Sequence, residues 1–229
     1  RGPAGADGAT GPQGPQGPQG PRGTGVLVPV ELSVDCATES LQAAIDNVRW
    51  ETPANITISG NCTDALTITK SNITITGATG RAVDTISGTI RVDGARRVKL
   101  DKLTVANQVL FTQGSSGNVS NSAISKSFTT ESGVISALGV YHNSHVTLID
   151  STVTASSGAY LGIAVFVQNG SSLYGEDSAI HCDGCRGALY VKHASVRTIN
   201  THIEFTGTSN VPTRMWRRFA IFAHVGATV

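Results

Sequence analysis

One residue pattern recurs through the second half of the chain, and it restricts the fold more than any other feature of the sequence. Each copy opens on a short apolar or β-branched segment, and most copies continue through a polar turn into a second such segment. The copies begin at Val109, Gly139, Ala164, Ala188 and Ala220, and residues 91–105 fit the same template. A repeat of about 20 to 30 residues with such short strands cannot bury its own apolar face. No helical period interrupts the pattern, so it predicts a solenoid of stacked β-coils.

The second segments align on their last apolar residue, and a polar residue stands three positions before it. These polar residues are Asn72, Lys102, Asn121, Asp150, Asp177 and Asn200. Because Asn and Asp tolerate left-handed backbone and bond their own turn, the column predicts a ladder of turns along the solenoid. The next column, with Ser122, Ser151, Ser178 and Thr201, predicts bonds between coils.

Two members of this turn ladder also fit a catalytic role. Asp150 and Asp177 would lie on neighbouring coils, and hydrolysis of a glycosidic bond uses two carboxyl groups that flank it. The ladder already accounts for both residues, because asparagine fills the same column above and below them. We therefore interpret them as structural and predict no catalytic residue from the sequence.

The first segments carry an aromatic column. Its members are Phe111, Tyr141, Phe166, Tyr190 and Phe222. Strand alternation in residues 163–168 places Ile163 inward and both Ala164 and Phe166 outward. We therefore expect an exterior stack with rings about 4.8 Å apart, which would form a subunit contact or a platform for sugars. A buried stripe of core residues is the alternative.

Residues 2–23 carry glycine at every third position, eight times in succession, and proline follows the glycine in five of these triplets. This period is typical of the collagen triple helix, in which only glycine fits at the crowded axis. A flexible Gly/Pro linker is the alternative, but a linker does not require a strict period. We predict that residues 1–24 form a collagen-like stalk. Since a triple helix needs three chains, this stalk predicts a homotrimer.

Residues 25–55 are expected to form a leading strand and one amphipathic helix. The helix is predicted over residues 40–49, with an apolar face that begins at Leu41 and with Thr38 or Ser40 as its N-cap. Such a helix would cover the open end of the first coil, which otherwise exposes unpaired strand edges and bare core.

The lead-in, the helix and the alternating Ile-Thr segments between residues 35 and 77 resemble the start of a pectate-lyase-like, right-handed parallel β-helix. The resemblance is closest to secreted bacterial parallel β-helix repeat proteins. It covers about residues 31–229 and implies an all-β fold, with residues 56–229 as the β-helix. It implies little about activity, because this fold carries lyases, glycosidases, adhesins and phage tailspikes alike. The motif set of polygalacturonases and the clustered aspartates of calcium-dependent pectate lyases are not found in the sequence.

Charge and cysteine content limit the partners and the compartment. The 17 basic and 16 acidic residues nearly balance, which gives no reason to expect nucleic acid as a partner, and no apolar run is long enough to span a bilayer. Four cysteines allow three pairings, and proximity favours Cys36 with Cys62 and Cys182 with Cys185. Disulfides imply an oxidising, extracellular setting. We predict neither a metal site nor a cofactor, because the cysteines and histidines form no complete ligand set.

Residues 211–219 interrupt the repeat with Arg214, Trp216 and Arg217, which suit a subunit contact or an acidic glycan. The sequence as a whole predicts a secreted or surface-exposed structural and adhesive protein. Its trimeric stalk would present β-helix heads that bind polysaccharide or one another with avidity. The alternatives are a polysaccharide lyase or glycoside hydrolase of the β-helix class, and a phage tail-fibre or tailspike component.

Overall fold

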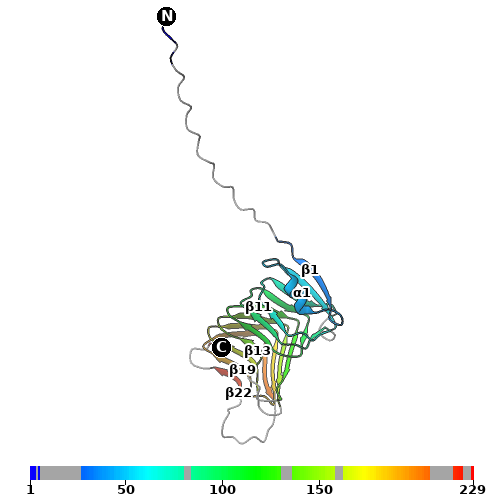
Figure 1. Ribbon diagram of the computed structural model, residues 1–229. Helices are drawn as coiled ribbons and strands as arrows, with labels where there is room; N and C mark the ends of the chain where they lie inside the picture. Colours follow the sequence, from blue (N-terminus) through cyan, green and yellow to red (C-terminus); the bar gives the residue numbers. More distant parts are fainter. Residues whose placement is uncertain are drawn as a thin grey trace.

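The computed structural model describes residues 1–3, 5, 27–79, 84–129, 136–157, 162–206, 219–223 and 228–229, without the side chains of Phe219, Ala220 and Phe222. The strands pair in parallel and form three sheets, and the described residues contain one helix. From the second strand onward, successive strands go to the three sheets in turn, so each coil of the chain adds one strand to each sheet. Figure 1 shows the coils stacked along one axis, which is the arrangement of a parallel β-helix. The predicted all-β fold with parallel coils is confirmed.

We name the sheets A, B and C in the order in which the chain visits them. Sheet A contains β1 (Val30–Asp35), β2 (Ala54–Ser59), β5 (Ile73–Gly77), β8 (Val98–Asp101), β11 (Ser116–Ser120), β14 (His145–Ile149), β17 (Ser172–Glu176) and β20 (Ser195–Ile199). Sheet B contains β3 (Asn61–Cys62), β6 (Thr85–Ile86), β9 (Thr104–Val105), β12 (Ala123–Ser127), β15 (Thr152–Ser156), β18 (Ala179–Asp183) and β21 (His202–Thr206). Sheet C contains β4 (Leu66–Ile68), β7 (Ile90–Asp93), β10 (Val109–Thr112), β13 (Ser136–Val140), β16 (Ile163–Gln168), β19 (Gly187–Lys192) and β22 (Phe219–Ala223).

Inward side chains of successive coils stack into apolar columns. In sheet A the register places Ile56 beside Ile75 and Ile75 beside Leu100, and all three side chains are fully buried. One coil alone encloses too little apolar surface, whereas stacked coils bury a continuous core. Each coil has three strands and not two, because the segment that the sequence indicated as a polar turn is the sheet A strand.

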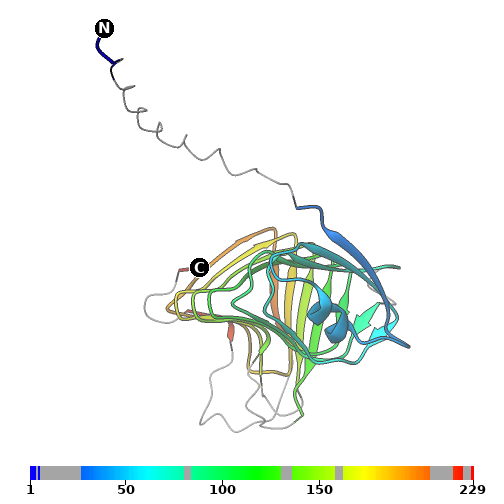
Figure 2. The same cartoon turned by 45° about the horizontal axis from the view of Figure 1, so that its top comes forward.

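Helix α1 (Leu41–Asn47) covers the N-terminal end of this core, as Figure 2 shows. Leu41 and Ile45 are buried, and the Ser40 hydroxyl caps the helix by accepting a hydrogen bond from the Ala43 N–H at 3.1 Å. A seven-residue helix would be unstable alone, so its stability comes from this packing. The helix is shorter than predicted by one residue at its start and two at its end.

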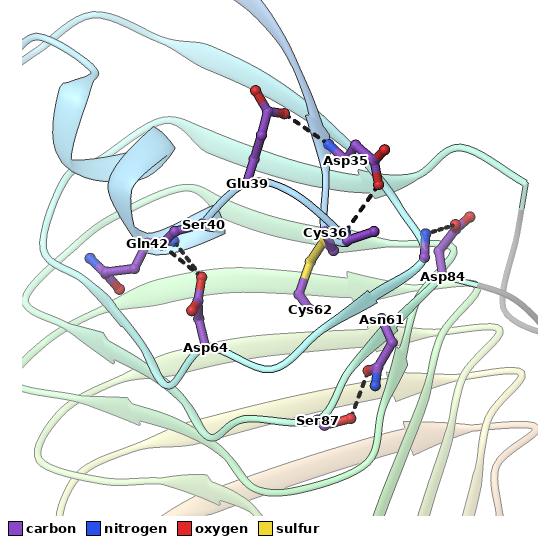
Figure 3. Close-up of a disulfide and its surroundings, with 12 residues drawn as sticks. Asp35, Cys36, Glu39, Ser40, Gln42, Asn61, Cys62, Asp64, Asp84 and Ser87 are labelled. Atoms are coloured by element: carbon purple, nitrogen blue, oxygen red, sulfur yellow. Dashed lines mark hydrogen bonds between the residues drawn. A yellow bond between two sulfur atoms is a disulfide. The ribbon is translucent and has the colours of Figure 1, made fainter.

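Charged side chains of the next coil complement both ends of the helix. The Asp64 carboxylate accepts hydrogen bonds from Ser40 Oγ at 2.9 Å and from the Gln42 N–H at 3.2 Å, where the helix dipole is positive (Figure 3). The Lys70 ammonium donates to three backbone carbonyls at the other end, at 2.5 to 3.2 Å. The cap is therefore fastened to the solenoid by polar contacts at both termini.

Both predicted disulfides are present. The Cys36–Cys62 bond joins the segment before α1 to β3, and Figure 3 shows it beside the cap. The Cys182–Cys185 bond links β18 to the tight turn before β19. The described residues contain no free cysteine.

The structure places most of the predicted turn ladder at one corner of the solenoid. Asn121, Asp150, Asp177 and Asn200 lie between sheets A and B, and each has a φ between 47° and 50°. Asn72 also has a positive φ, of 63°, but it lies at the corner between sheets C and A. The prediction that it belongs to the same column is therefore wrong, because the alternating strand that follows it belongs to sheet A and not to sheet B.

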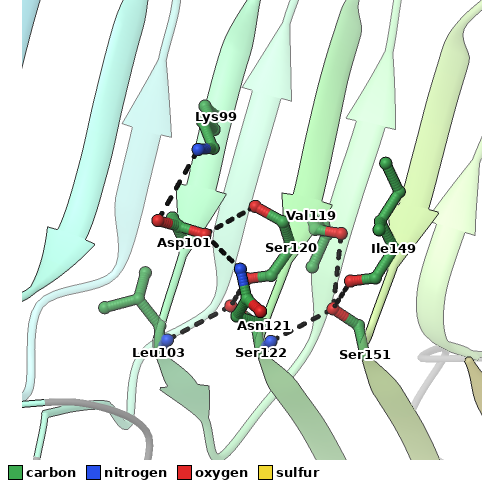
Figure 4. Close-up of polar contacts among 9 residues, drawn as sticks. All are labelled: Lys99, Asp101, Leu103, Val119, Ser120, Asn121, Ser122, Ile149 and Ser151. Carbon is green, nitrogen blue, oxygen red and sulfur yellow. Dashed lines mark hydrogen bonds and ion pairs between the residues drawn. The ribbon is translucent and has the colours of Figure 1, made fainter. Parts of the chain in front are cut away.

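Buried serines follow the turn ladder at the same corner. The Ser151 hydroxyl accepts a hydrogen bond from the Ser122 N–H at 3.1 Å and donates to the Ile149 carbonyl at 2.7 Å. The Ser122 and Ser178 hydroxyls make the corresponding bonds one coil to either side. Figure 4 shows that the Ser122 and Ser151 hydroxyls each link two coils through backbone groups and not through another hydroxyl, and the bonds of Ser178 follow the same pattern.

Candidate binding groove

A groove of about 690 Å³ crosses five strands on the outer face of sheet A. Its walls come from β8, β11, β14, β17 and β20, with Thr228 at one end. The inward residues of these strands, such as Val146 and Val196, belong to the buried core. The outward residues therefore determine what the groove can bind, and its volume lies in the range of small-molecule sites, about 300 to 1,000 Å³.

Strand register arranges the outward residues in two rows that run along the solenoid axis. The first row pairs Ser116, His145, Ser172 and Ser195 from strand to strand. The second row pairs Lys99, Asn118, Thr147, Tyr174 and Arg197. Neighbouring strands lie about 4.8 Å apart, so each row offers one side chain per strand to an extended ligand.

Basic residues lie at both ends of the groove. Arg97 and Lys99 line it at β8 and Arg197 lines it at β20, about 19 Å away at four strand spacings. His145 lies between them, and its Nδ1 is 2.7 Å from Ser172 Oγ. No described residue that lines the groove is an aspartate or a glutamate. The groove therefore has a positive lining in a chain whose total charge is close to zero.

Asp101 lies next to the groove and pairs with Lys99. Its Oδ2 is 3.6 Å from Lys99 Nζ, and its Oδ1 accepts hydrogen bonds from Ser120 Oγ at 2.6 Å and Asn121 Nδ2 at 3.0 Å (Figure 4). Burial alone would raise the pKa of this carboxyl, but the bonds from Ser120 and Asn121, together with Lys99, outweigh burial and lower the pKa. Asp101 therefore stays ionised and is not suited to act as a general acid.

Tyr174 is the aromatic side chain of the groove. Its hydroxyl donates a hydrogen bond to Glu176 Oε2 at 3.0 Å, and this bond raises the pKa of the phenol above its ordinary value. The bond also ties down the free end of the side chain. Tyr174 is half-buried and lines the groove, and aromatic rings in such places can stack on a sugar ring.

Asn118 carries an unused acceptor in the second row, between Lys99 and Thr147. Its Oδ1 is buried and has no hydrogen-bond partner in the described part of the chain. Because a buried polar atom without a partner costs about 1 to 3 kcal/mol, such atoms are uncommon in stable folds. A rotation of the amide that turned this oxygen toward the groove would let a ligand hydroxyl satisfy it.

The two aspartates considered for catalysis do not line the groove. Asp150 and Asp177 are exposed at the corner of the turn ladder, on neighbouring coils. The carboxylates nearest the groove, Asp101 and Glu176, lie three strand spacings apart, about 14 Å, whereas glycosidase pairs are separated by about 5 to 9.5 Å. Among the described residues, no group of three His, Cys, Asp or Glu side chains could hold a metal ion. No described helix is long and apolar enough to cross a membrane.

The predicted external aromatic column is wrong at Phe111. This side chain is fully buried in the core, and its strand neighbours are Val92 and Val140. The outward residue of β10 is Leu110, which pairs with Gly139. Aligning the repeats on their aromatic residues shifted this copy by one position, and a shift of one residue moves a side chain to the opposite face.

Tyr141, Phe166 and Tyr190 lie side by side on the outer face of sheet C. Their ring centroids are 5.6 Å and 4.7 Å apart. Tyr141 follows the end of β13, and its ring covers Gly139, where a Cβ would lie 2.5 Å from the Tyr141 ring. Tyr141 and Phe166 are each only 8% exposed, so this outer aromatic cluster is a second small core and not an open surface.

Sheet C also differs from the predicted alternation at the start of β16. Ile163 packs in the outer aromatic cluster, whereas Ala164 belongs to the main core, the reverse of the expectation. The strand pairing skips Ala164 in β16 and the equivalent Ala188 in β19, although the residues on both sides of each alanine are paired. Strand alternation is interrupted at this position in both coils, so the residues before it face the opposite side from the one that simple alternation predicts.

The remaining predicted contact residues lie outside the described parts of the chain. Arg214, Trp216 and Arg217 belong to residues 207–218, and the structure describes the backbone but not the side chain of Phe222. Of the collagen-like segment, only residues 1–3 and 5 are described. The groove itself was not predicted from the sequence, although alternation in residues 145–149 and 195–199 indicates two of its strands.

Comparison with known proteins supplies no family for this chain. No protein-family model matches it, and no curated protein matches it. Solved structures that resemble it include a crystal structure of a pectin methylesterase mutant in complex with a hexasaccharide. That likeness covers 87% of this chain and 90% of the other, at 13% sequence identity and a TM-score of 0.47. At these values it carries no argument about activity or substrate.

Proposed function

We propose that this chain is a secreted or surface-exposed binding protein whose β-helix head takes a polysaccharide in the groove of sheet A. The observation that carries the proposal is the pair of outward rows, which repeat hydrogen-bonding side chains at every strand spacing. A polysaccharide is a repeating ligand, and an extended sugar chain along the axis would meet a new side chain of each row at each strand.

The lining indicates a polysaccharide with acidic groups. Arg97, Lys99 and Arg197 provide positive charge, and no described acidic residue lines the groove to repel an anion. Tyr174 provides a surface for stacking, and Asn118 Oδ1 provides an acceptor for a sugar hydroxyl. Arginine is well suited to carboxylate and sulfate groups because its guanidinium donates two parallel hydrogen bonds.

The collagen-like residues 1–24 are proposed to join three heads on one stalk. Strict glycine at every third position supports a triple helix. Three weak sites on one stalk would bind a repeating polysaccharide with avidity, since the second and third contacts form at high effective concentration. The disulfides Cys36–Cys62 and Cys182–Cys185 fit an extracellular location.

Titration of the full chain with two matched oligosaccharides tests the head. Mannuronate hexamer and mannohexaose share linkage and ring stereochemistry and differ in the carboxylate at C6. We expect the mannuronate hexamer to bind and added salt to weaken its binding. Arg197→Gln should lower the affinity about tenfold, the usual loss for one charged hydrogen bond. Arg91→Gln is the matched control, because Arg91 is exposed on sheet C away from the groove. If neither this pair nor a wider set of acidic and neutral glycans binds, the proposal is wrong.

A further inference from the structure

Exposed large hydrophobic side chains gather at the N-terminal end of the solenoid. Four of the seven such side chains in the described part of the chain are Leu27, Val28, Val30 and Trp50, with exposures of 59%, 79%, 42% and 67%. Trp50 follows helix α1, and its turn is joined to β1 by the hydrogen bond from the Val30 N–H to the Pro53 carbonyl at 2.9 Å. Figure 1 places β1 and α1 at the same end of the solenoid, opposite β22.

Helix α1 does not cover these four residues. Its own apolar residues Leu41 and Ile45 are used to close the core. Strand β1 pairs only with β2, so it is the edge strand of sheet A. Apolar residues beside an open strand edge favour uncontrolled association unless a defined partner covers them.

The Gly-X-Y sequence determines which partner is within reach. In a triple helix each glycine lies at the common axis, and Leu27 follows Gly23 by four residues. A residue spans at most about 3.6 Å, so in such a trimer each Leu27 lies within about 14 Å of the axis. Three copies of Leu27 and Val28 would therefore be held close together, whereas the exposed Ile199 and Ile221 belong to the last coil, at the other end of the head.

We propose that Leu27, Val28, Val30 and Trp50 form a neck contact, in which three copies of this chain pack against one another directly below the collagen-like segment. The inference rests on the proposed trimer and adds the surface that holds it. The three chains of a triple helix must pair in register. The neck contact supplies a fixed starting point, because it joins folded heads whose relative position determines that register.

The test compares the full chain with a neck variant, Leu27→Ser/Val28→Ser/Trp50→Ser. All three side chains are largely exposed, so the head should remain folded. The matched control is Ile199→Ser/Ile221→Ser, which removes exposed apolar side chains at the other end. Sedimentation velocity measures the association state, and circular dichroism measures melting of the triple helix. We expect the neck variant to dissociate at concentrations where the control is a trimer, and its triple helix to melt at a lower temperature.

Two further variants separate the possible failures. Gly14→Val interrupts the glycine period and should abolish the triple helix. If Gly14→Val loses the trimer but the neck variant behaves as wild type, the neck contact is wrong and the proposed trimer stands. If the wild-type chain is monomeric, both are wrong. Val28→Cys should cross-link between chains on oxidation and Ile221→Cys should not, and equal cross-linking of the two would also overturn the neck contact.

Discussion

Replacing Ser151 with alanine tests how the coils are joined at the corner between sheets A and B. The side chain is 2% exposed, and its hydroxyl is the acceptor for the Ser122 N–H at 3.1 Å. In Ser151→Ala that N–H loses its acceptor in a buried setting, which costs about 1 to 3 kcal/mol. The Ile149 carbonyl keeps the hydrogen bond that it accepts from the Asn121 N–H, so its loss is small. We therefore expect the free energy of unfolding to fall by about 2 kcal/mol.

The double variant Ser122→Ala/Ser151→Ala distinguishes backbone bonding from bonding between hydroxyls. Each hydroxyl accepts from a different N–H, that of Leu103 for Ser122 and that of Ser122 for Ser151. Because the two substitutions leave different N–H groups without an acceptor, the double variant should cost clearly more than either single variant, up to about 4 kcal/mol, whereas a shared bond between the hydroxyls would be lost only once.

Urea unfolding followed by circular dichroism measures these differences. The control is Ser125→Ala, an exposed serine on β12, and surface substitutions of this kind change stability by less than about 0.5 kcal/mol. A Ser151→Ala variant within that range of wild type would refute the reasoning. A double variant that costs no more than the larger single variant would refute the backbone bonding.

Three more substitutions test the cap, the carboxylate beside the groove and the packing of the coils. Lys70→Met removes the ammonium from three carbonyls at the C-terminal end of α1, those of Ile45, Asp46 and the C-cap Val48, and should cost about 1 to 2 kcal/mol. Amide exchange in residues 41–47 should be faster in this variant than in the control Lys192→Met. The folded pKa of Asp101 lies below its ordinary 3.8, so its contribution to stability is present above about pH 4 and is lost as the pH falls through the folded pKa. The difference in urea midpoint between wild type and Asp101→Asn should therefore shrink between pH 7 and pH 3, and a constant difference would contradict this. Gly88→Ala should lower the free energy of unfolding by about 3 kcal/mol, because a Cβ there would lie 1.7 Å from the Asp64 carbonyl oxygen. Gly175→Ala is the control for the same urea measurement and should be tolerated, because the nearest atoms to its Cβ would be 3.4 Å away.

The sequence predicts two strands of each coil but not the third, which belongs to sheet A. Alternating apolar residues and left-handed Asn or Asp follow from local chemistry, so the corner at Asn121, Asp150 and Asp177 could be located before any coordinates. The sheet A strands could not be located as easily, because Ser-Gly-Asn-Val-Ser at residues 116–120 has the composition of a turn. Its strand geometry comes from pairing with β8 and β14, which composition does not record.

Packing between coils also determines which face of sheet C each aromatic side chain occupies, and the sequence pattern predicted the wrong face for Phe111. Phe111 matches Phe166 in a list of aromatic residues, yet the two face opposite sides, because the register pairs Phe166 with Gly139 and Gly139 with Leu110. Tyr141 reaches the outer face from beyond the strand end only because Gly139 leaves room for its ring. A ring that fills the space left open by a glycine is placed by three-dimensional proximity, so no sequence periodicity could reveal it.

The columns of equivalent side chains along the solenoid, buried and outward, show where function can be encoded in a repeat protein. A column that keeps one residue type from coil to coil, such as the serines at 122, 151 and 178, is explained by the coil geometry that recurs with it. The second groove row changes instead at every strand, through Lys99, Asn118, Thr147, Tyr174 and Arg197. These residues face outward, so stacking does not determine them, and the solenoid would form with other polar residues in their place. These outward positions are therefore free to adapt to a ligand, and the acidic polysaccharide proposed above would use the cations at both ends of the row and the aromatic ring of Tyr174.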